Sequence, residues 1–275
     1  MTKLRALMAN RRFLSLVLVA VFGLGLPATA LALGLRAAAP SQPSVPVSHT
    51  SSATPQIGAL YANGSTTHHG CTASVVDSTR GNTLITAAHC VSGSGSGMVF
   101  VPGERGGTAP YGRWTVTAVH VAPSWVARQD PHVDVAFLTV ARRTIHGRQT
   151  NVQQVTGGYR LGAAARQGES VTITGYPAGT DNDPIACHPS TYLTREYPTF
   201  DCRGYVDGTS GSPWLHATKR GFEVVGVIGG LNQGGCVDST SYSSPLGRAA
   251  EIAYFRAAVG VASDDAPTPD SDGCT

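Results

Sequence analysis

Short apolar and β-branched runs, separated by turn-forming residues, recur along most of this chain and limit the folds open to it. They span residues 57–61, 72–76, 83–88, 98–101, 114–121, 133–140, 170–177, 185–187 and 222–230. Runs of this length are typical of strands, and their spacing is typical of a barrel or a sandwich. The charged fraction of 13% is about half the usual value. We therefore expect an all-β fold.

Helical spacing is confined to the end of the chain, after Pro245. The apolar residues that recur there at helical intervals are Ala249, Ile252, Phe255, Ala258 and Val259. This periodicity predicts a C-terminal helix.

The first 32 residues have the pattern of an export signal. Four basic residues accompany an apolar run from Phe13 to Leu26, and small residues with A-x-A spacing follow at Ala28, Ala30 and Ala32. The run is shorter than the roughly 18 to 20 residues that a membrane anchor needs, and no second such run follows. Residues 1–32 are therefore interpreted as a signal peptide, which predicts a secreted, extracellular protein without stable membrane association after cleavage.

The rest of the chain divides into three parts by composition. Residues 33–56 are rich in proline, serine and alanine, which predicts a disordered linker or a short pro-segment. Residues 57–262 have the length of one all-β domain, and residues 263–275 form an acidic tail. Removal of the signal peptide takes four positive charges from the formal +3, leaving about −1. The charge thus gives no reason to expect a nucleic-acid partner.

Six cysteines in a secreted chain predict disulfides. They are Cys71, Cys90, Cys187, Cys202, Cys236 and Cys274. Cys71 and Cys90 flank a compact stretch and are expected to pair. Cys187 and Cys202 flank two strands joined by a turn, which favours a cross-strand bridge and leaves Cys236 with Cys274; a Cys202–Cys236 bridge is the alternative. An oxidised Cys71 cannot join His68 and His69 in a metal site, and we expect neither a metal nor a cofactor.

Three short motifs contain residues suited to nucleophilic catalysis. "TAAHC" places His89 at the end of an apolar strand, "DVAFL" places Asp134 at the start of another, and "GTSGSP" places Ser210 between glycines. A serine hydroxyl becomes a good nucleophile when a base takes its proton and an acid orients that base. Taken singly, each motif also suits a structural role: a packed histidine, a capping aspartate or a surface turn.

The glycines around Ser210 indicate a second catalytic feature, a pair of main-chain N–H donors. Gly208 and Gly211 permit a tight turn that exposes the Ser210 hydroxyl and directs the N–H groups of Gly208 and Ser210 at one point. Such a point can stabilise an oxyanion.

These motifs, in the order His, Asp, Ser, resemble those of chymotrypsin-like serine peptidases. The segments "IGALY", "CTASVV", "TITGYP" and "GTSGSPW" are most similar to secreted bacterial members, the group that includes glutamyl endopeptidases. The resemblance covers roughly residues 57–260. It implies two six-stranded antiparallel β-barrels, with the site in the cleft between them, and a C-terminal helix. It also implies Ser210 as nucleophile, His89 as general base and then acid, and Asp134 as the orienting carboxylate.

The chain departs from this family at the residue before the serine. Thr209 occupies the position at which digestive members have an aspartate that pairs with the new N-terminus after activation. We therefore expect that this activation switch does not operate here.

The resemblance further implies a substrate pocket between residues 204–207 and 227–231. Its candidate binding residues are Tyr205, Asp207, Ile228, Gly229, Gly230 and Leu231. Ile228 occupies the place of a histidine with which glutamyl endopeptidases meet the substrate carboxylate, so we expect acidic P1 residues not to be preferred. Asp201 or Asp207 would favour Arg or Lys at P1, and apolar P1 residues are the alternative.

Together these observations predict a monomeric secreted serine endopeptidase that cuts protein or peptide substrates through an acyl-enzyme intermediate. The alternative hypothesis is a catalytically inactive peptidase homologue that acts as an extracellular binding protein. The intact set of three motifs favours the enzyme.

Overall fold

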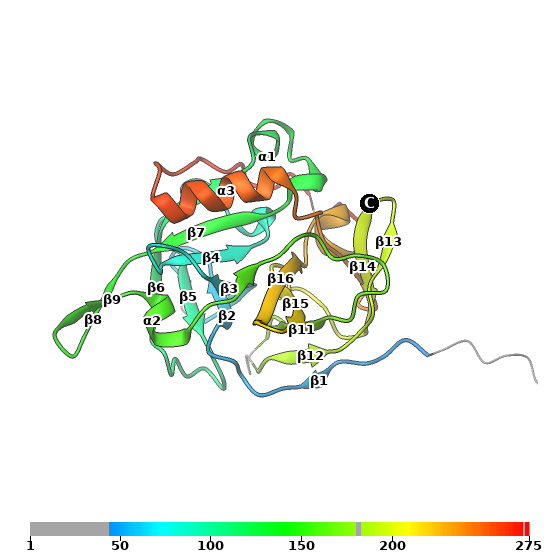
Figure 1. Ribbon diagram of the computed structural model, residues 1–275, viewed down its shortest axis with the longest axis horizontal. Coiled ribbons are helices and arrows are strands. Elements are labelled where there is room, and N and C mark those ends of the chain that lie inside the picture. The colour runs from blue at the N-terminus through cyan, green and yellow to red at the C-terminus, as the bar shows by residue number, and fades with distance from the viewer. Residues whose placement is uncertain (1–43, 66, 180–182, 272, 275) are drawn as a thin grey trace, which may run out of the picture. The chain divides into compact units, whose positions relative to one another are not determined.

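Six strands in the first half of the chain close into an antiparallel barrel in the order β2-β3-β4-β7-β6-β5 (Figure 1). Their bounds are β2 Ile57–Tyr61, β3 His69–Val76, β4 Thr83–Thr86, β5 Val99–Pro102, β6 Trp114–Val121 and β7 Ala136–Val140. A sequence run predicted each of them. The strands β2, β4 and β7 are buried at every position. The barrel interior is filled by apolar side chains that include Leu60, Val75, Phe100, Trp114 and Leu138.

This computed structural model describes residues 44–65, 67–179, 183–271, 273 and 274. They belong to the second of two compact units, Ser44–Thr275. The predicted signal peptide and residues 33–43 lie outside the described residues. Within the described ranges, no helix is long and apolar enough to cross a membrane.

The second half of the domain forms open sheets. A six-stranded sheet has the order β1-β12-β11-β15-β16-β10, and a three-stranded sheet has the order β13-β14-β17. Their bounds are β1 His49–Thr50, β10 Arg160–Leu161, β11 Thr172–Gly175, β12 Ile185–Cys187, β13 Tyr192–Thr194, β14 Tyr197–Asp201, β15 Pro213–Thr218, β16 Gly221–Val227 and β17 Thr240–Tyr242. The pair β10–β16 is parallel. In the described residues the all-β prediction is thus confirmed, with one closed barrel.

The segment before β2 pairs with β12, so residues 44–56 do not fit a disordered linker; the alternative, a short pro-segment, stays a prediction. His49 and Thr50 pair with Ala186 and Ile185 on β12. Next to them, the N–H of Arg203 donates to Pro46 O over 2.8 Å. Proline and serine favour an extended backbone, and an available sheet edge supplies the hydrogen bonds that this segment could not make alone.

The predicted C-terminal helix is present as α3, Arg248–Val259, and packs on β6 and β7. Its buried face is formed by small residues: Ala250, Ala253, Ala257 and Ala258. The larger side chains of the helix are exposed: Ile252 by 50%, Phe255 by 63% and Val259 by 47%. Alanines permit a closer approach of helix to barrel than branched side chains do, so the smaller stripe faces the core.

Short helices and a hairpin complete the fold. They are η1 Ala88–Cys90, α1 Pro123–Arg128, η2 Pro131–Val133, the hairpin of β8 Arg143–Ile145 with β9 Arg148–Thr150, α2 Val152–Thr156 and η3 Leu231–Gly234. Because η2 occupies the start of the run 133–140, strand β7 begins only at Ala136.

The acidic tail is packed on the barrel rather than free. The N–H of Val121 donates to Asp264 Oδ2 over 2.9 Å, and the Arg256 guanidinium forms two hydrogen bonds with the same carboxylate. Burial opposes ionisation of Asp264, but these bonds outweigh it and lower its pKa. Farther along, buried Ala266 pairs with Gly93.

Three disulfides join the six cysteines: Cys71–Cys90, Cys187–Cys202 and Cys236–Cys274. Cys71–Cys90 was predicted; of the two alternatives left open for Cys202, the bridge to Cys187 is present and the bridge to Cys236 is wrong. Cys187 ends β12, whereas Cys202 follows β14, so this bridge links two different sheets instead of two strands of one hairpin. The hairpin inside the interval is β13–β14.

Candidate active site

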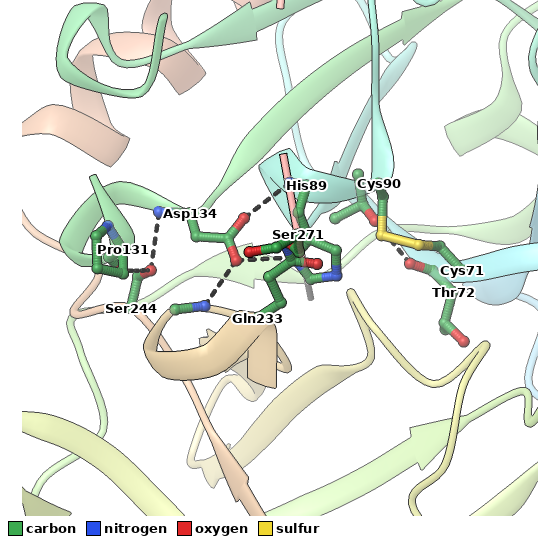
Figure 2. A network of polar contacts seen from close by, with 11 residues as sticks. Cys71, Thr72, His89, Cys90, Pro131, Asp134, Gln233, Ser244 and Ser271 are labelled. Atoms are coloured by element: carbon green, nitrogen blue, oxygen red, sulfur yellow. Dashed lines mark hydrogen bonds and ion pairs between the residues drawn. A yellow bond between two sulfur atoms is a disulfide. The ribbon is translucent and has the colours of Figure 1, made fainter. Parts of the chain in front are cut away.

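Asp134 is fully buried and holds His89 by two hydrogen bonds (Figure 2). Asp134 Oδ2 lies 2.8 Å from His89 Nδ1, and Oδ1 accepts the main-chain N–H of His89 over 2.8 Å. A third donor, the N–H of Gly230, reaches Oδ2 over 2.7 Å. A carboxylate is tolerated in the interior when charge-assisted hydrogen bonds of this kind satisfy it. The arrangement fixes the imidazole with Nδ1 toward the acid.

The backbone of Asp134 is fixed by Ser244, which the sequence did not single out. The N–H of Asp134 donates to Ser244 Oγ over 2.9 Å, and that hydroxyl donates to Pro131 O over 2.8 Å. Ser244 is fully buried, so it supports the carboxylate from the side opposite to His89 (Figure 2).

Ser210 sits on a tight turn that only glycine can build at two positions. Gly208 has φ +90° and Gly211 has φ +81°. A Cβ on Gly208 would lie 2.4 Å from Ala178 N, and one on Gly211 would lie 2.2 Å from Thr86 Oγ1. The turn therefore packs directly on the strand end that precedes His89.

Strand β3 holds the Ser210 turn on the other side. The N–H of Thr72 donates to Ser210 O over 2.7 Å, and its hydroxyl donates to Gly208 O over 3.0 Å. The preceding residue, Cys71, is bonded to Cys90, the neighbour of His89. One short stretch of β3 is thus tied both to the serine turn and to the histidine segment.

Two N–H groups of the turn are directed away from the protein's own acceptors. Asp207 O accepts the N–H of Ala178 over 2.7 Å, and Thr209 O accepts the N–H of Ser212 over 3.0 Å. In a trans peptide the N–H points opposite to the carbonyl, so Gly208 N–H and Ser210 N–H point the other way. Among the described residues neither N–H has an acceptor. Such a pair can bind an oxyanion.

A cavity of about 430 Å³ opens beside Ser210. Of the predicted binding residues, Tyr205, Asp207 and Ile228 line it. Gly229 and Gly230 instead contact Asp134, and Leu231 lines an adjoining cavity. The sequence did not predict the lining residues Gln233, Asp238 and Cys274.

Two residues near this cavity have other roles. Tyr205 donates its hydroxyl hydrogen to Ile173 O over 2.9 Å, and burial raises the pKa of this phenol. Asp201 does not line the cavity: its Oδ1 accepts the hydroxyls of Tyr192 and Thr240. Of the two aspartates proposed for a basic P1 residue, Asp207 alone is in place.

The family model for the trypsin-like peptidase domain matches residues 71–227, more than half of the chain, and this range contains His89, Asp134 and Ser210. The chain belongs to the trypsin-like peptidase family. Its fold is similar to that of protease Anisep from Arthrobacter nicotinovorans, at a TM-score of 0.66 and 24% identity over 78% of this chain and 100% of that one. It is also similar to the structure of a Glu endopeptidase, at a TM-score of 0.59 and 17% identity over 78% of this chain and 97% of that one.

A curated relative of this trypsin-like peptidase is the "Extracellular metalloprotease" of Bacillus subtilis strain 168. The two are 30% identical over 172 residues, 58% of this chain and 50% of the relative. The chain therefore spans about half the length of that relative.

Thr209, directly before Ser210, occupies the position at which an aspartate was expected in digestive members of the trypsin-like peptidase family. Its hydroxyl donates to Val206 O over 2.7 Å, and the residue is 2% exposed. The side chain thus closes its own turn and carries no charge for an incoming N-terminus.

Proposed function

We propose that this chain is a secreted serine endopeptidase with Ser210 as nucleophile, His89 as base and Asp134 as orienting acid. The observation that carries the proposal is the doubly bonded His89–Asp134 pair next to a glycine-flanked serine turn with two unpaired N–H groups. A binding protein derived from a peptidase has no need to retain all of these groups.

The mechanism follows from the direction of each bond. Asp134 holds His89 Nδ1 as a donor, which leaves Nε2 with a lone pair. Nε2 takes the Ser210 hydroxyl proton while Oγ bonds to the substrate carbonyl carbon, and the carbonyl oxygen becomes an anion held by Gly208 N–H and Ser210 N–H. Nε2 then gives the proton to the leaving amine as the C–N bond breaks. Water attacks the acyl-enzyme by the same steps and restores Ser210.

The name of the Bacillus relative raises the question of a metal. In the described ranges, Cys71, His89 and Cys90 form the one group of three potential ligands, with ligand atoms within 4.8 Å of one another. The two sulfurs are bonded to each other, so neither offers the thiolate that a metal binds. These residues do not fit a metal, and the proposed mechanism uses none.

The same proposal includes the second barrel, the substrate class and the monomeric state. The two open sheets of the second half correspond to the second six-stranded barrel, and the cleft between the halves holds the site. The substrates are proteins or peptides met outside the cell, and the mature chain acts as a monomer after removal of residues 1–32. The three disulfides suit an oxidising compartment.

Labelling with a fluorophosphonate probe tests the proposal, because this reagent bonds to an activated serine. The wild type should label and hydrolyse peptides, and Ser210→Ala should do neither while its thermal midpoint stays within a few degrees. Ser96→Ala, at an exposed serine of the barrel, is the matched control and should label like the wild type. A folded wild type that does not label would favour the inactive homologue.

A further inference from the structure

The end of the chain returns to the active-site cleft. We call Thr268–Ser271, Gly273 and Cys274 the strap. Gln129 Nε2 donates to Thr268 O over 3.4 Å, Gln233 Nε2 donates to Ser271 O, and Cys274 is bonded to Cys236. Figure 2 draws Gln233 and Ser271 in the same view as the His89–Asp134 pair.

The strap borders two cavities that share Asn232 and Gln233. The first contains Ser210, and Cys274 lines it. The second, of about 290 Å³, is lined on the domain side by residues that include Trp125, Pro131 and Leu231, and on the strap side by Asp270, Ser271 and Gly273. Pro131 also accepts the hydroxyl of Ser244, so this second cavity lies next to the support of Asp134.

The position of the strap matters because of the path a substrate would follow. Ile228 lines the cavity beside Ser210, Leu231 lines the second cavity, and the strap lines that second cavity as well. Gly273 lies so close to Asn232 that a Cβ on it would be 3.0 Å from the Asn232 Cα. A substrate chain that continues past Leu231 would meet the strap, because Leu231 and the strap residues Asp270, Ser271 and Gly273 line the same cavity.

The segment under the strap is held in an unfavourable conformation. Asn232 and Gln233 have φ of +50° and +51°, the left-handed region that residues with a side chain rarely occupy. Consecutive residues keep this conformation when their surroundings impose it. The strap supplies two such constraints, the bond to Gln233 and the disulfide to Cys236.

We propose that the strap is a self-inhibitory element that occupies the path of substrate residues preceding the cut bond. It is anchored at one end where Ala266 pairs with Gly93 and at the other by Cys236–Cys274. Opening this disulfide frees the path for extended substrates. The proposal rests on the proposed peptidase function.

The Cys236–Cys274 disulfide, which holds the strap, is also the bridge that a reductant reaches most easily. Cys236 and Cys274 are exposed, whereas Cys71, Cys187 and Cys202 are buried. Exchange with a thiol requires access to a sulfur, so mild reduction should open the strap before the other two bridges. Peptide mapping after alkylation would identify which pair had opened.

The test compares the mature wild type with Cys236→Ser/Cys274→Ser, which removes the bridge and leaves no free thiol. Two substrates share one P1 residue: a single-residue ester and a peptide with four residues before the cut bond. The ratio of kcat/KM for the peptide to that for the ester should rise at least about tenfold in the variant. Gln233→Ala should raise it by a smaller factor. Asp265→Asn, in the tail but outside both cavities, is the control and should leave the ratio unchanged.

An unchanged or lower ratio in a disulfide variant whose fluorophosphonate labelling and thermal transition show a folded, active enzyme would overturn the strap's inhibitory role. The same labelling identifies failure of the proposed function itself, since neither the wild type nor the variant would then react.

Discussion

The hydroxyl of Thr72 donates to the carbonyl of Gly208 over 3.0 Å and accepts the N–H of Tyr176 over 2.9 Å. A fully buried residue of the closed barrel thereby fixes the turn that carries Ser210, although Gly208 lies 136 positions farther along the chain.

Thr72→Val should separate this hydroxyl's contribution from its volume. It leaves a buried carbonyl and a buried N–H unpaired, so we expect a stability loss of about 1 to 3 kcal/mol. The displaced turn should lower kcat by about tenfold or more. Thr72→Ser keeps the hydroxyl and should retain most of the activity. Equal kinetics for the valine and serine variants would show that the bond does not position the turn.

Asp134→Asn should fold and lose about 10⁴-fold in kcat, because an amide at this position favours the imidazole tautomer with its lone pair on the wrong nitrogen. Asp130→Asn is the matched control: this carboxylate also accepts a main-chain N–H, from His132, but does not contact His89. Its kcat/KM should change by no more than about twofold. Similar losses in both variants would argue against the role assigned to Asp134.

The stability of the domain should fall on mild acidification because of His120. This residue is fully buried, and neither ring nitrogen has a partner among the described residues. Burial lowers its pKa from 6.5, the nearby Asp264 opposes that shift, and Arg256 adds to it. Between the folded pKa and 6.5, the unfolded chain binds a proton that the folded chain does not. The contribution of neutral His120 to the free energy of unfolding is therefore present above pH 6.5 and is lost as the pH falls toward the folded pKa.

Denaturant midpoints measured above and below pH 6.5 check whether the domain loses stability on acidification. His120→Met should reduce the difference between the two, and His68→Met, at an exposed histidine, should leave it unchanged. An undiminished difference in His120→Met would assign the pH dependence to other groups.

The cavity beside Ser210 should prefer a basic P1 residue over an acidic one. Asp207 and Asp238 line it, and no lysine or arginine of the described residues does. An acidic side chain would meet these carboxylates and Ile228, without a positive partner to offset its desolvation. A peptide library varied at P1 should show weak cleavage after Glu and Asp.

Three substitutions assign the charge responsible for the P1 preference. Asp207→Asn or Asp238→Asn should reduce cleavage after Arg and Lys about tenfold, whereas Asp201→Asn, whose carboxylate is engaged by Tyr192 and Thr240, should not. Dominant cleavage after Glu would refute the assignment of the cavity.

His89, Asp134 and Ser210 could be singled out from the sequence as candidate site residues because each lies in a short motif of recognisable neighbours. A histidine after an apolar strand, an aspartate before one and a serine between glycines are local patterns. The six barrel strands were predicted for the same reason, since alternation and turn residues are also local.

Asp238, Ser244 and the strap could not be predicted in this way. Asp238 reaches the cavity because the N–H groups of Gly204 and Tyr205 donate to its carbonyl across more than thirty residues of chain, and no sequence pattern marks that approach. The face of α3 shows the same limit. Its large and small apolar residues form two stripes at helical spacing. The alanine stripe faces the barrel, and the sequence alone does not indicate which stripe makes that contact.

The short strand β1 has a consequence for the behaviour of the protein in concentrated solution. It covers one side of β12, and the stretch before it pairs with Arg203. Residues 44–56 include no buried side chain, so their proteolytic removal would spare the core but leave β12 with a bare row of N–H and C=O groups. An uncovered strand of this kind recruits a strand from another molecule. The trimmed enzyme would therefore be lost to aggregation sooner than to unfolding.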